Sequence, residues 1–413
     1  MAENSQEGTI RIVSLNCWGL KYVSKHRKLR LEGIADLLSQ KADQYDIVAL
    51  QEIWVEEDFR KIEDRLSKQL CYSKFYYGGI LTGPGLAVFS RWPIESVSTR
   101  PFTLNGRPSA FFRGDWYVGK SVASAIIRHP LQKIELLSSH MHAPYGEGDA
   151  AYTCHRTAQA WEMAHMSRRS IDSGHLAIAV GDLNSIPGSA TYKLLQMVGG
   201  LADSWVEKHG HFSGDIGKLS YDDQIRIAGV TCDSLLNTWR ADRQPHEAKR
   251  LDYIFFDPSR AAVKDSRVSF IEKLDVGSCS DHFALETDLV LSTNKINSSH
   301  AFTATDVRGL FKEILDLIDE YRPTSIWQKN VRILHFWISF VVLVGMCVSV
   351  FWGAANGRAY VGFVYLVVGI LITITGLLDG LIGFLFGRHE MRALREFASQ
   401  VEMESDVLEM PDA

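Results

Sequence analysis

Hydrophobic residues in the first 290 positions fall in short runs, several of them apolar at consecutive positions and rich in β-branched side chains. Such runs are typical of strands that are buried on both faces. Three other segments, 26–40, 56–69 and 149–170, have apolar residues at helical spacing. Strands mixed with helices predict an α/β or α+β domain around packed sheets, with strands at 10–15, 47–50, 86–89, 122–127, 134–137, 176–180, 251–256 and 283–291.

A different pattern begins near residue 331. Segment 333–352 has 20 residues without a formal charge, and segment 359–386 has 28 residues with Asp379 as its one charge. A bilayer core needs about 20 apolar residues per helix, and GAANGR at 353–358 is long enough only for a tight turn. We therefore predict a transmembrane hairpin over 331–387. The alternative, two buried helices of a soluble domain, rarely involves apolar runs of this length.

The polar stretch STNKINSSH, 292–300, separates the two patterns. It suggests a catalytic domain over 1–291, a linker with an amphipathic juxtamembrane helix over 292–330, the hairpin, and a C-terminal tail over 388–413. Residues Thr305 to Tyr321 place their apolar side chains on one helical face, and Pro323 is expected to end that helix. The face would pack on the catalytic domain or a partner chain, or lie on the membrane surface.

Charge and cysteine usage narrow the function. The chain has 44 basic and 49 acidic residues, a net charge of −5, which disfavours a dedicated nucleic-acid binder. The start, MAENSQEG, lacks the basic and apolar regions of a signal peptide. Six scattered cysteines without a CxxC pair favour reduced thiols over disulfides or a zinc site. Both termini are expected to be cytosolic, because basic residues flank the hairpin (Lys329, Arg332, Arg388, Arg392 and Arg395), whereas its turn holds only Arg358.

Polar residues gather where several predicted strands begin or end. Loops at strand ends present side chains from a rigid scaffold. A single Glu or His at such a position is usually structural, but here amide and carboxylate oxygens occur together without a thiol, which favours Mg²⁺. Histidines that can act as acid and base beside such a cation point to phosphate-ester hydrolysis. The set comprises Asn16, Gln51, Glu52, His140, His142, Asp182, Asn184, Asp252, Asp281 and His282.

The order of these motifs resembles a known family. Asn16, Gln51-Glu52, His140, GDLN at 181–184, RLDYIFF at 250–256 and SDH at 280–282 resemble the DNase I-like endonuclease/exonuclease/phosphatase superfamily. This resemblance covers residues 10–290 and implies a sandwich of two packed β-sheets flanked by helices. SLNCWG, SKHR, GDWYVGKS and HRTAQAWE, with the hairpin, are similar to the neutral sphingomyelinases. HMHAPY, TCDSLLNTWR and RQPHEAKRLDY are more similar still to fungal inositol phosphosphingolipid phospholipases C.

The resemblance also implies the cofactor and part of the site. Glu52 would be the principal ligand of Mg²⁺, with Asn16 beside it, and Mn²⁺ could take the place of Mg²⁺. Asp182 and Asn184 would position the attacking water and a phosphate oxygen. Asp233, within TCDSLLNTWR, is expected on the substrate side of the site.

The proton-transfer roles follow from the same resemblance. His282 would be the general base, oriented by Asp252, and Asp281 would be a neighbouring polar group able to serve the metal. His140 would face the other side of the phosphorus and assist the leaving ceramide oxygen. In the alternative division, Asp182 is the base and His282 stabilises the phosphate. His142, two residues after His140, is the weaker candidate of the two histidines.

The segment GDWYVGKS, 114–121, satisfies the GxxxxGK[ST] pattern of nucleotide-binding phosphate loops. A true phosphate loop follows a buried strand and opens a helix, whereas the strand-like VASAII follows this segment. We therefore expect no ATP site. In the sphingomyelinases the equivalent segment is P-loop-like, which implies that Asp115 and Lys120 form a substrate-linked gate; the alternative is a hairpin with a surface ion pair.

Together these features predict a membrane-anchored sphingolipid phospholipase C that releases ceramide and a phosphorylated head group. The alternatives are an enzyme preferring sphingomyelin, a tethered nuclease, an inositol-polyphosphate phosphatase and a catalytically silent scaffold. The expected partners are a sphingolipid substrate in the membrane and anionic phospholipids as activators, but no nucleic acid; the oligomeric state stays open, a homo-oligomer included. The endoplasmic reticulum is the expected location, with the mitochondrial outer membrane as the alternative.

Overall fold

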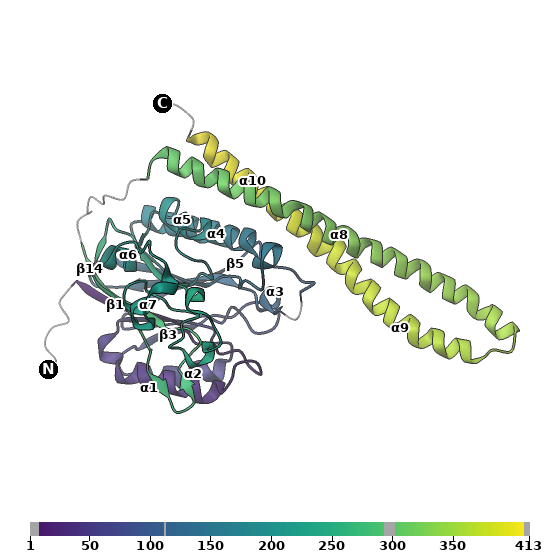
Figure 1. Ribbon diagram of the computed structural model, residues 1–413, viewed down its shortest axis with the longest axis horizontal. Coiled ribbons are helices and arrows are strands. Elements are labelled where there is room, and N and C mark those ends of the chain that lie inside the picture. Colours follow the sequence, from purple (N-terminus) through teal and green to yellow (C-terminus); the bar gives the residue numbers. More distant parts are fainter. Residues whose placement is uncertain (1–7, 111–112, 293–301, 409–413) are drawn as a thin grey trace. The chain divides into compact units, whose positions relative to one another are not determined.

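The computed structural model describes residues 8–110, 113–292 and 302–408 (Figure 1). The chain divides into two compact units. The first comprises Met1–Gly106 with Phe112–Leu310, and the second comprises Arg107–Phe111 with Phe311–Ala413. The N-terminal unit contains the sheets and the C-terminal unit contains the longest helices. The predicted linker at 292–300 falls almost wholly outside the described residues.

Two six-stranded sheets form the N-terminal unit. The first has the order β11-β14-β1-β2-β4-β3, and the second has the order β5-β6-β7-β8-β10-β9. Each contains one parallel pair, β1 with β2 and β7 with β8, among otherwise antiparallel pairs. The strands are β1 (Thr9–Asn16), β2 (Ile47–Gln51), β3 (Tyr72–Phe75), β4 (Ala87–Ser90), β5 (Ile94–Pro101), β6 (Ser121–Arg128), β7 (Lys133–His140), β8 (Leu176–Asp182), β9 (Ala202–Asp203), β10 (Asp252–Phe256), β11 (Ala261–Ser269) and β14 (Ala284–Leu291), beside a small hairpin of β12 (Lys273–Leu274) and β13 (Gly277–Ser278).

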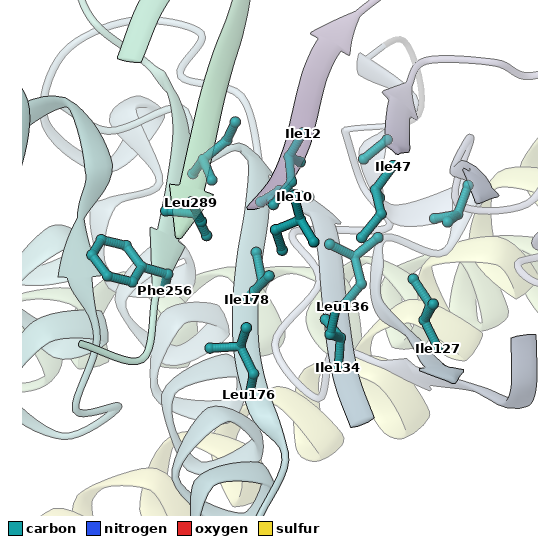
Figure 2. Close-up of a cluster of buried hydrophobic side chains, with 14 of the residues drawn as sticks. Ile10, Ile12, Ile47, Ile127, Ile134, Leu136, Leu176, Ile178, Phe256 and Leu289 are labelled. Carbon is teal, nitrogen blue, oxygen red and sulfur yellow. The ribbon is translucent and has the colours of Figure 1, made fainter. Parts of the chain in front are cut away.

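The apolar side chains of the two sheets meet in a shared core. Alternate residues of a strand point to opposite faces, so Ile10 and Ile12 of β1 enter the cluster between the sheets, while Val13 and Leu15 enter a second cluster. Figure 2 shows the first cluster, in which Leu136 and other side chains of the second sheet pack with those of the first. Burial on both faces explains why these strands are apolar at consecutive positions.

Helices cover the sheets. Helices α1 (Arg27–Gln40) and α2 (Glu56–Leu66) contribute buried side chains to the second cluster, while α4 (Thr153–Asp172) packs against β7 and β8 and α5 (Ala190–Met197) packs against α4. Shorter helices are α3 (Asp115–Val118), α6 (Ser204–His209) and α7 (Tyr221–Arg226), with 3₁₀ turns at Ala42–Gln44, Gly148–Ala151, Ile216–Lys218, Thr238–Arg240 and Pro245–Glu247. The architecture confirms the predicted sandwich of two packed sheets flanked by helices.

The C-terminal unit consists of long helices. They are α8 (Ala304–Ala355), α9 (Tyr360–Leu381), a π-helical stretch (Ile382–Phe386) and α10 (Gly387–Val407). The stretches Ala304–Ala355 and Tyr360–Val407 are long and apolar enough to cross a membrane, and only 6% of the most apolar window of each is buried. Such low burial separates them from the core helices of a soluble domain, so they indicate membrane association.

One prediction about this unit is wrong, because Pro323 does not end a helix. It lies inside α8, which continues for 32 residues beyond it to Ala355. A proline inside a helix removes one backbone hydrogen bond and disfavours the preceding turn. The long helix-compatible apolar stretch that follows outweighs this local penalty.

Polar contacts join α8 to the helices that return beside it. Arg332 Nη1 lies 2.6 Å from Asp379 Oδ1, and His335 Nδ1 lies 2.7 Å from Asp379 Oδ2, so the charge noted inside the second apolar segment has two partners. Close approach of α8 and α9 requires small residues. A Cβ added to Gly376 would lie 2.6 Å from the Cβ of Ser339.

The juxtamembrane helix is the first part of α8, and its predicted face is buried at Leu310, Phe311, Ile314, Ile318 and Tyr321. Tyr321 Oη donates to Glu390 Oε1 of α10 at 2.7 Å, and Ser325 Oγ donates to Glu390 Oε2 at 3.2 Å. Arg107 Nε donates to Tyr321 Oη at 2.9 Å. Part of this face therefore lies against the chain's own C-terminal helix, an arrangement that none of the alternatives from the sequence included.

Candidate active site

The strand register collects the predicted site residues at one end of the sandwich. In the first sheet Asn16 pairs with Gln51 across the parallel strands β1 and β2. In the second sheet His140 of β7 pairs with Asp182 of β8, which in turn pairs with Asp252 of β10. Each sheet thus presents a row of polar residues at the carboxyl end of its parallel pair.

Asn16 joins the two rows. Its Nδ2 donates to Glu52 Oε1 and to Asp182 Oδ2, both at 3.1 Å. Its Oδ1 accepts the Trp18 backbone N–H at 3.0 Å, which fixes the orientation of the amide. Asn16 therefore holds the two carboxylates through its nitrogen, and its role as an oxygen ligand of a metal stays a prediction.

His282 is held by a buried aspartate. Its Nδ1 lies 2.8 Å from Asp252 Oδ2, and its Nε2 lies 3.8 Å from Asp182 Oδ2. Burial alone would lower the pKa of His282, but the acidic groups of Cys232, Asp252 and Asp182 outweigh it and raise the pKa well above the usual range. A ring with Nδ1 bound in this way presents Nε2 to the centre of the site.

The buried carboxyl groups of the site have raised pKa values, mainly because burial disfavours their charged form. Burial raises the pKa of Glu52 to about 7, and Asp281 nearby adds to the effect. Burial also raises the pKa of Asp182 to about 6. Within the described part of the chain, Asp252 Oδ1 is buried and has no hydrogen-bond partner. An oxygen-rich buried set of this kind fits a hard divalent cation.

Two groupings of these residues could hold that cation. Ligand atoms of Asp182, Asp252 and His282 lie within 4.8 Å of one another. However, Asp252 and the Nδ1 atom of His282 already bind each other, as in an oriented acid–base pair. Glu52 together with Asp182 supplies oxygens that are free of such a pair, so we favour them as ligands.

Lys120 lies beside His140 on the other side of Asp182. Lys120 Nζ is 3.2 Å from His140 Nε2 and donates to the Met141 carbonyl at 2.6 Å. Burial, reinforced by the Lys120 charge, lowers the pKa of His140 well below the usual range. His140 Nε2 is therefore placed to accept a hydrogen bond from Lys120 Nζ.

Lys120 is paired with Asp115 in the interior. Lys120 Nζ lies 2.9 Å from Asp115 Oδ1, the Lys120 residue is 1% exposed, and Tyr145 Oη donates to Asp115 Oδ2 at 2.7 Å. Burial would raise the pKa of Asp115, but Lys120 and His142 outweigh burial and lower it to about 2. The pair is not the surface pair of the alternative considered from the sequence. Strand β6, not a helix, follows it, as expected.

His142, the weaker candidate of the two histidines, belongs with the Asp115 pair. Its ring stacks on Tyr152 with centroids 3.9 Å apart, and its Nδ1 lies 3.5 Å from Asp115 Oδ2. Asn184 lies nearer the centre: its backbone N–H donates to Asp182 Oδ1 at 2.8 Å, and its Nδ2 donates to the Met141 carbonyl at 3.0 Å.

Asp281 and Asp233 share one arginine. Arg240 Nη2 donates to Asp281 Oδ2 at 2.7 Å, and its Nε lies 3.5 Å from Asp233 Oδ1. Asp233 also lies 3.2 Å from Arg243 and 3.4 Å from Lys249. Asp233 therefore organises three cations beside Cys232, which forms an isolated β-bridge with His282. Its place on the substrate side stays a prediction.

Backbone strain marks the same region. Glu52, Asn184 and Asp233 have φ values of 58°, 48° and 55°, in the left-handed region that residues other than glycine seldom occupy. Strain of this kind gathers at sites where the surrounding structure fixes a side chain for function. At Glu52 it turns the chain directly after β2.

Sequence reasoning missed three side chains that support the site. Trp54 Nε1 donates to Glu52 Oε2 at 3.4 Å, and its ring lies 6.4 Å from that of His140. Tyr145 and Arg240 bind predicted residues as described above. Trp54 lies only two positions after Glu52, so its nearness was a usable signal, whereas Tyr145 and Arg240 reach partners 30 and 41 residues away.

Comparison with known proteins agrees with this geometry. The model of the endonuclease/exonuclease/phosphatase family matches residues 13–282, a range that contains all the proposed site residues. The chain belongs to this family. A crystal structure of the beta toxin of Staphylococcus aureus shares the fold, with a TM-score of 0.50 and 19% identity over 67% of this chain and 99% of the toxin.

Curated relatives divide into two groups. An inositol phosphosphingolipids phospholipase C of Saccharomyces cerevisiae is 41% identical over 99% of this chain and 91% of its own length. A protein of the same name from Schizosaccharomyces pombe is 38% identical over 95% and 93%. Human sphingomyelin phosphodiesterase 2 is 35% identical, over 48% of this chain and 46% of its own length. Likeness to the first group extends through the C-terminal helices.

Proposed function

We propose that this protein is a metal-dependent phospholipase C that hydrolyses inositol phosphosphingolipids to ceramide and a phosphorylated head group. The observation that carries the proposal is the junction of the two sheets, where Asn16 holds Glu52 and Asp182 beside the His282–Asp252 pair. Two relatives that match nearly the whole chain, at 41% and 38% identity, bear the name of this activity. Two helices suited to a membrane support the proposal, because an anchored enzyme would lie near lipid substrates.

The acid–base chemistry follows from His282. Asp252 fixes its Nδ1, so Nε2 faces the site and can take a proton from the attacking water when the ring is neutral, a form that a cation held by the nearby carboxylates would favour. The carboxylates around the ring stabilise the imidazolium that this transfer forms. Asp182 is the alternative base, but Asn16 and the Asn184 backbone already donate to its two oxygens. Because both oxygens of Asp182 already accept hydrogen bonds, we favour His282 as the general base.

The other residues position the phosphodiester. Mg²⁺, or Mn²⁺ in its place, held by Glu52 and Asp182 would polarise a phosphate oxygen when bound. Lys120 offers a charged donor beside His140, suited to a second phosphate oxygen or to the leaving ceramide oxygen. Asn184 stays oriented by Met141 on the same side.

Membrane attachment completes the proposal. The C-terminal helices anchor the protein with both termini in the cytosol, in the endoplasmic reticulum or, as the alternative, the mitochondrial outer membrane. Basic residues beside the apolar segments, such as Lys329 and Arg388, would each gain about 1 kcal/mol near anionic lipids. This attraction supports anionic phospholipids as activators. A homo-oligomer is compatible with the same anchor.

The deciding experiment is mass spectrometry of the products. The purified full chain receives inositol phosphoceramide, sphingomyelin and a glycerophospholipid in mixed micelles, with Mg²⁺ or with EDTA. We expect ceramide and inositol phosphate as the main products, and none with EDTA. Sphingomyelin as the better substrate would favour the second candidate, a neutral sphingomyelinase, for which the likeness to the human phosphodiesterase speaks. Plasmid cleavage or inositol-polyphosphate hydrolysis in parallel assays would overturn the proposal, as would no turnover at all.

A further inference from the structure

The loop between β3 and β4 exposes apolar side chains at its tip. Ile80 is 67% exposed and Leu81 is 71% exposed, and Tyr77 on the same loop is 56% exposed. From Tyr76 to Ser90 the sequence, YYGGILTGPGLAVFS, contains no formal charge. A soluble surface seldom keeps adjacent large aliphatic residues exposed without a partner that covers them.

The end of this loop, at Gly85, lies beside residues that contact the proposed metal ligand Glu52. The Gly85 carbonyl accepts the Ile53 backbone N–H at 3.0 Å. A Cβ added to Gly85 would lie 2.8 Å from the ring of Trp54, so only glycine allows the loop to pass this closely. Trp54 in turn donates to Glu52.

The other part of the loop lies on the segment that contains Lys120. The backbone N–H groups of Ile80 and Leu81 both donate to the Tyr117 carbonyl, at 3.0 and 3.3 Å. Gly79 and Gly119 face each other so closely that a Cβ added to Gly119 would lie 2.4 Å from the Gly79 Cα. The tip is therefore bonded to the helix α3 region, which precedes Lys120.

We infer that the Ile80-Leu81 tip is a membrane-contact element, which enters the lipid surface and thereby presents the site to its substrate. The inference rests on the proposed function, because the scissile bond of a sphingolipid lies at the membrane surface. A lipid bilayer fits this tip better than a protein partner, since the loop is uncharged and the two residues at its tip, Ile80 and Leu81, are aliphatic and exposed. The tip is bonded to both sides of the site, so membrane contact also fixes the backbone around Lys120.

The first test measures contact directly, whether or not the protein is an enzyme. The full chain with Cys71→Ser and Cys347→Ser receives a fluorescent label at Leu81→Cys and is reconstituted in vesicles of phosphatidylcholine and phosphatidylserine. The control label is at Leu131→Cys, in the β6–β7 turn at the opposite end of β7 from His140, where the native residue is 41% exposed. We expect lipids with a nitroxide on the acyl chain to quench the Leu81 label several-fold more than the control label, and iodide to quench it less. Equal quenching at both sites would overturn the inference, as would self-quenching that reports a second copy at the tip.

The second test connects the contact to turnover. In Ile80→Ser/Leu81→Ser, the ratio of activity on bilayer substrate to activity on a short-chain soluble analogue should fall at least about tenfold, because less apolar surface enters the membrane. The matched control is Leu131→Ser/Val290→Ser, two exposed apolar residues away from the site, and its ratio should equal that of the wild type. An unchanged ratio in the tip variant would contradict the inference. If the wild type cleaves no sphingolipid, the proposed function fails, and the quenching result still decides whether the tip touches lipid.

Discussion

Asp252 Oδ2 lies 2.8 Å from Nδ1 of His282, and both residues are buried. This contact determines which ring nitrogen faces the reaction centre. It also connects the two sheets, because Asp252 begins β10 of the second sheet and His282 precedes β14 of the first. A proton-transfer group held from both layers keeps its orientation as long as the sandwich is folded.

Asp252→Asn tests this orientation. We expect kcat to fall about 10²- to 10⁴-fold with little change in KM, because the amide neither fixes the tautomer of the neutral ring nor stabilises the protonated ring. Steady-state kinetics on inositol phosphoceramide measures the effect. Asp46→Asn is the matched control, since Asp46 is a buried, ion-paired aspartate at the other end of β2. It should lose stability but keep the kcat of the folded fraction; an equal loss of kcat in both variants would remove the special role of Asp252.

Glu52→Gln tests the metal assignment. The substitution keeps shape and burial but removes the carboxylate charge, so turnover at saturating substrate should fall roughly 10²-fold or more and the Mg²⁺ concentration for half-activity should rise. A titration of activity with Mg²⁺, followed by calorimetry of metal binding, measures both. Glu56→Gln, at an exposed position four residues later at the start of helix α2, is the control and should behave as wild type. Full activity of Glu52→Gln at ordinary Mg²⁺ would exclude Glu52 as a ligand.

The sequence was sufficient to predict the strands whose two faces are both buried. All eight predicted strands occur, because strands such as β2 and β8 are buried on both faces and read as continuous apolar runs. Strand β5 was missed because most of its residues are exposed and polar. The prediction that Pro323 ends a helix was wrong, because the rule that proline breaks helices does not take into account the stability of the long apolar helix around it.

The site was predictable as a set of residues but not as a set of contacts. Motif order predicted that Asn16, Asp182 and His282 would gather, and these three residues lie together at one end of the sandwich, while their roles stay predictions. The sequence did not reveal that the Gln51 side chain is buried and donates to Ser14 Oγ. It also did not reveal that Lys120 is buried, since its burial depends on tertiary partners such as Tyr145 and Met141.

Lys120→Ala should reduce both stability and activity. It leaves Asp115 buried without its cation, which costs about 3–5 kcal/mol when one partner of a buried pair is removed. It also removes a charge-assisted donor next to His140, so activity on micellar lipid should fall at least about tenfold. Thermal unfolding and turnover of the double variant Lys120→Met/Asp115→Asn separate the effects: stability should recover, activity should not. Recovery of activity in the double variant would reduce the pair to a structural role.

No variant should gain or lose affinity for ATP, and stoichiometric ATP binding by the wild type would contradict the predicted absence of an ATP site.

His142 should make the fold sensitive to acid. Burial lowers the pKa of His142 to about 3, below the value of about 6.5 in the unfolded chain. Between these values the unfolded state binds a proton that the folded state does not, so stability falls as pH falls, by about 1.4 kcal/mol per pH unit. His142→Asn should therefore lose less thermal stability between pH 7 and pH 5 than the wild type, whereas the exposed control His211→Asn should not differ from it. The same acid response in all three proteins would show that His142 does not contribute.

Truncation tests the separation of chemistry from anchoring. A chain that ends at about residue 300 retains every proposed site residue, since His282 is the last of them, and it lacks both helices suited to a membrane. It should remain in the supernatant when vesicles are sedimented, because the tip at Leu81 alone offers too little apolar surface for stable attachment. It should hydrolyse detergent-dispersed substrate better than bilayer substrate, and activation by anionic lipid should weaken.

Truncation also removes the hydrogen bonds that Tyr321 makes. Truncation removes Tyr321 and Glu390, and with them the hydrogen bond that Arg107 makes in the C-terminal unit. Loss of that partner alone could lower activity, so the matched control is the full-length chain with Tyr321→Phe, which breaks the same contact but keeps the anchor. If Tyr321→Phe retains bilayer activity while the truncated chain loses it, the tether is responsible. A truncated protein that still sediments with vesicles and cleaves bilayer lipid as fast as the full chain would contradict the anchoring role of the helices. Membrane binding would then have to reside in the N-terminal unit.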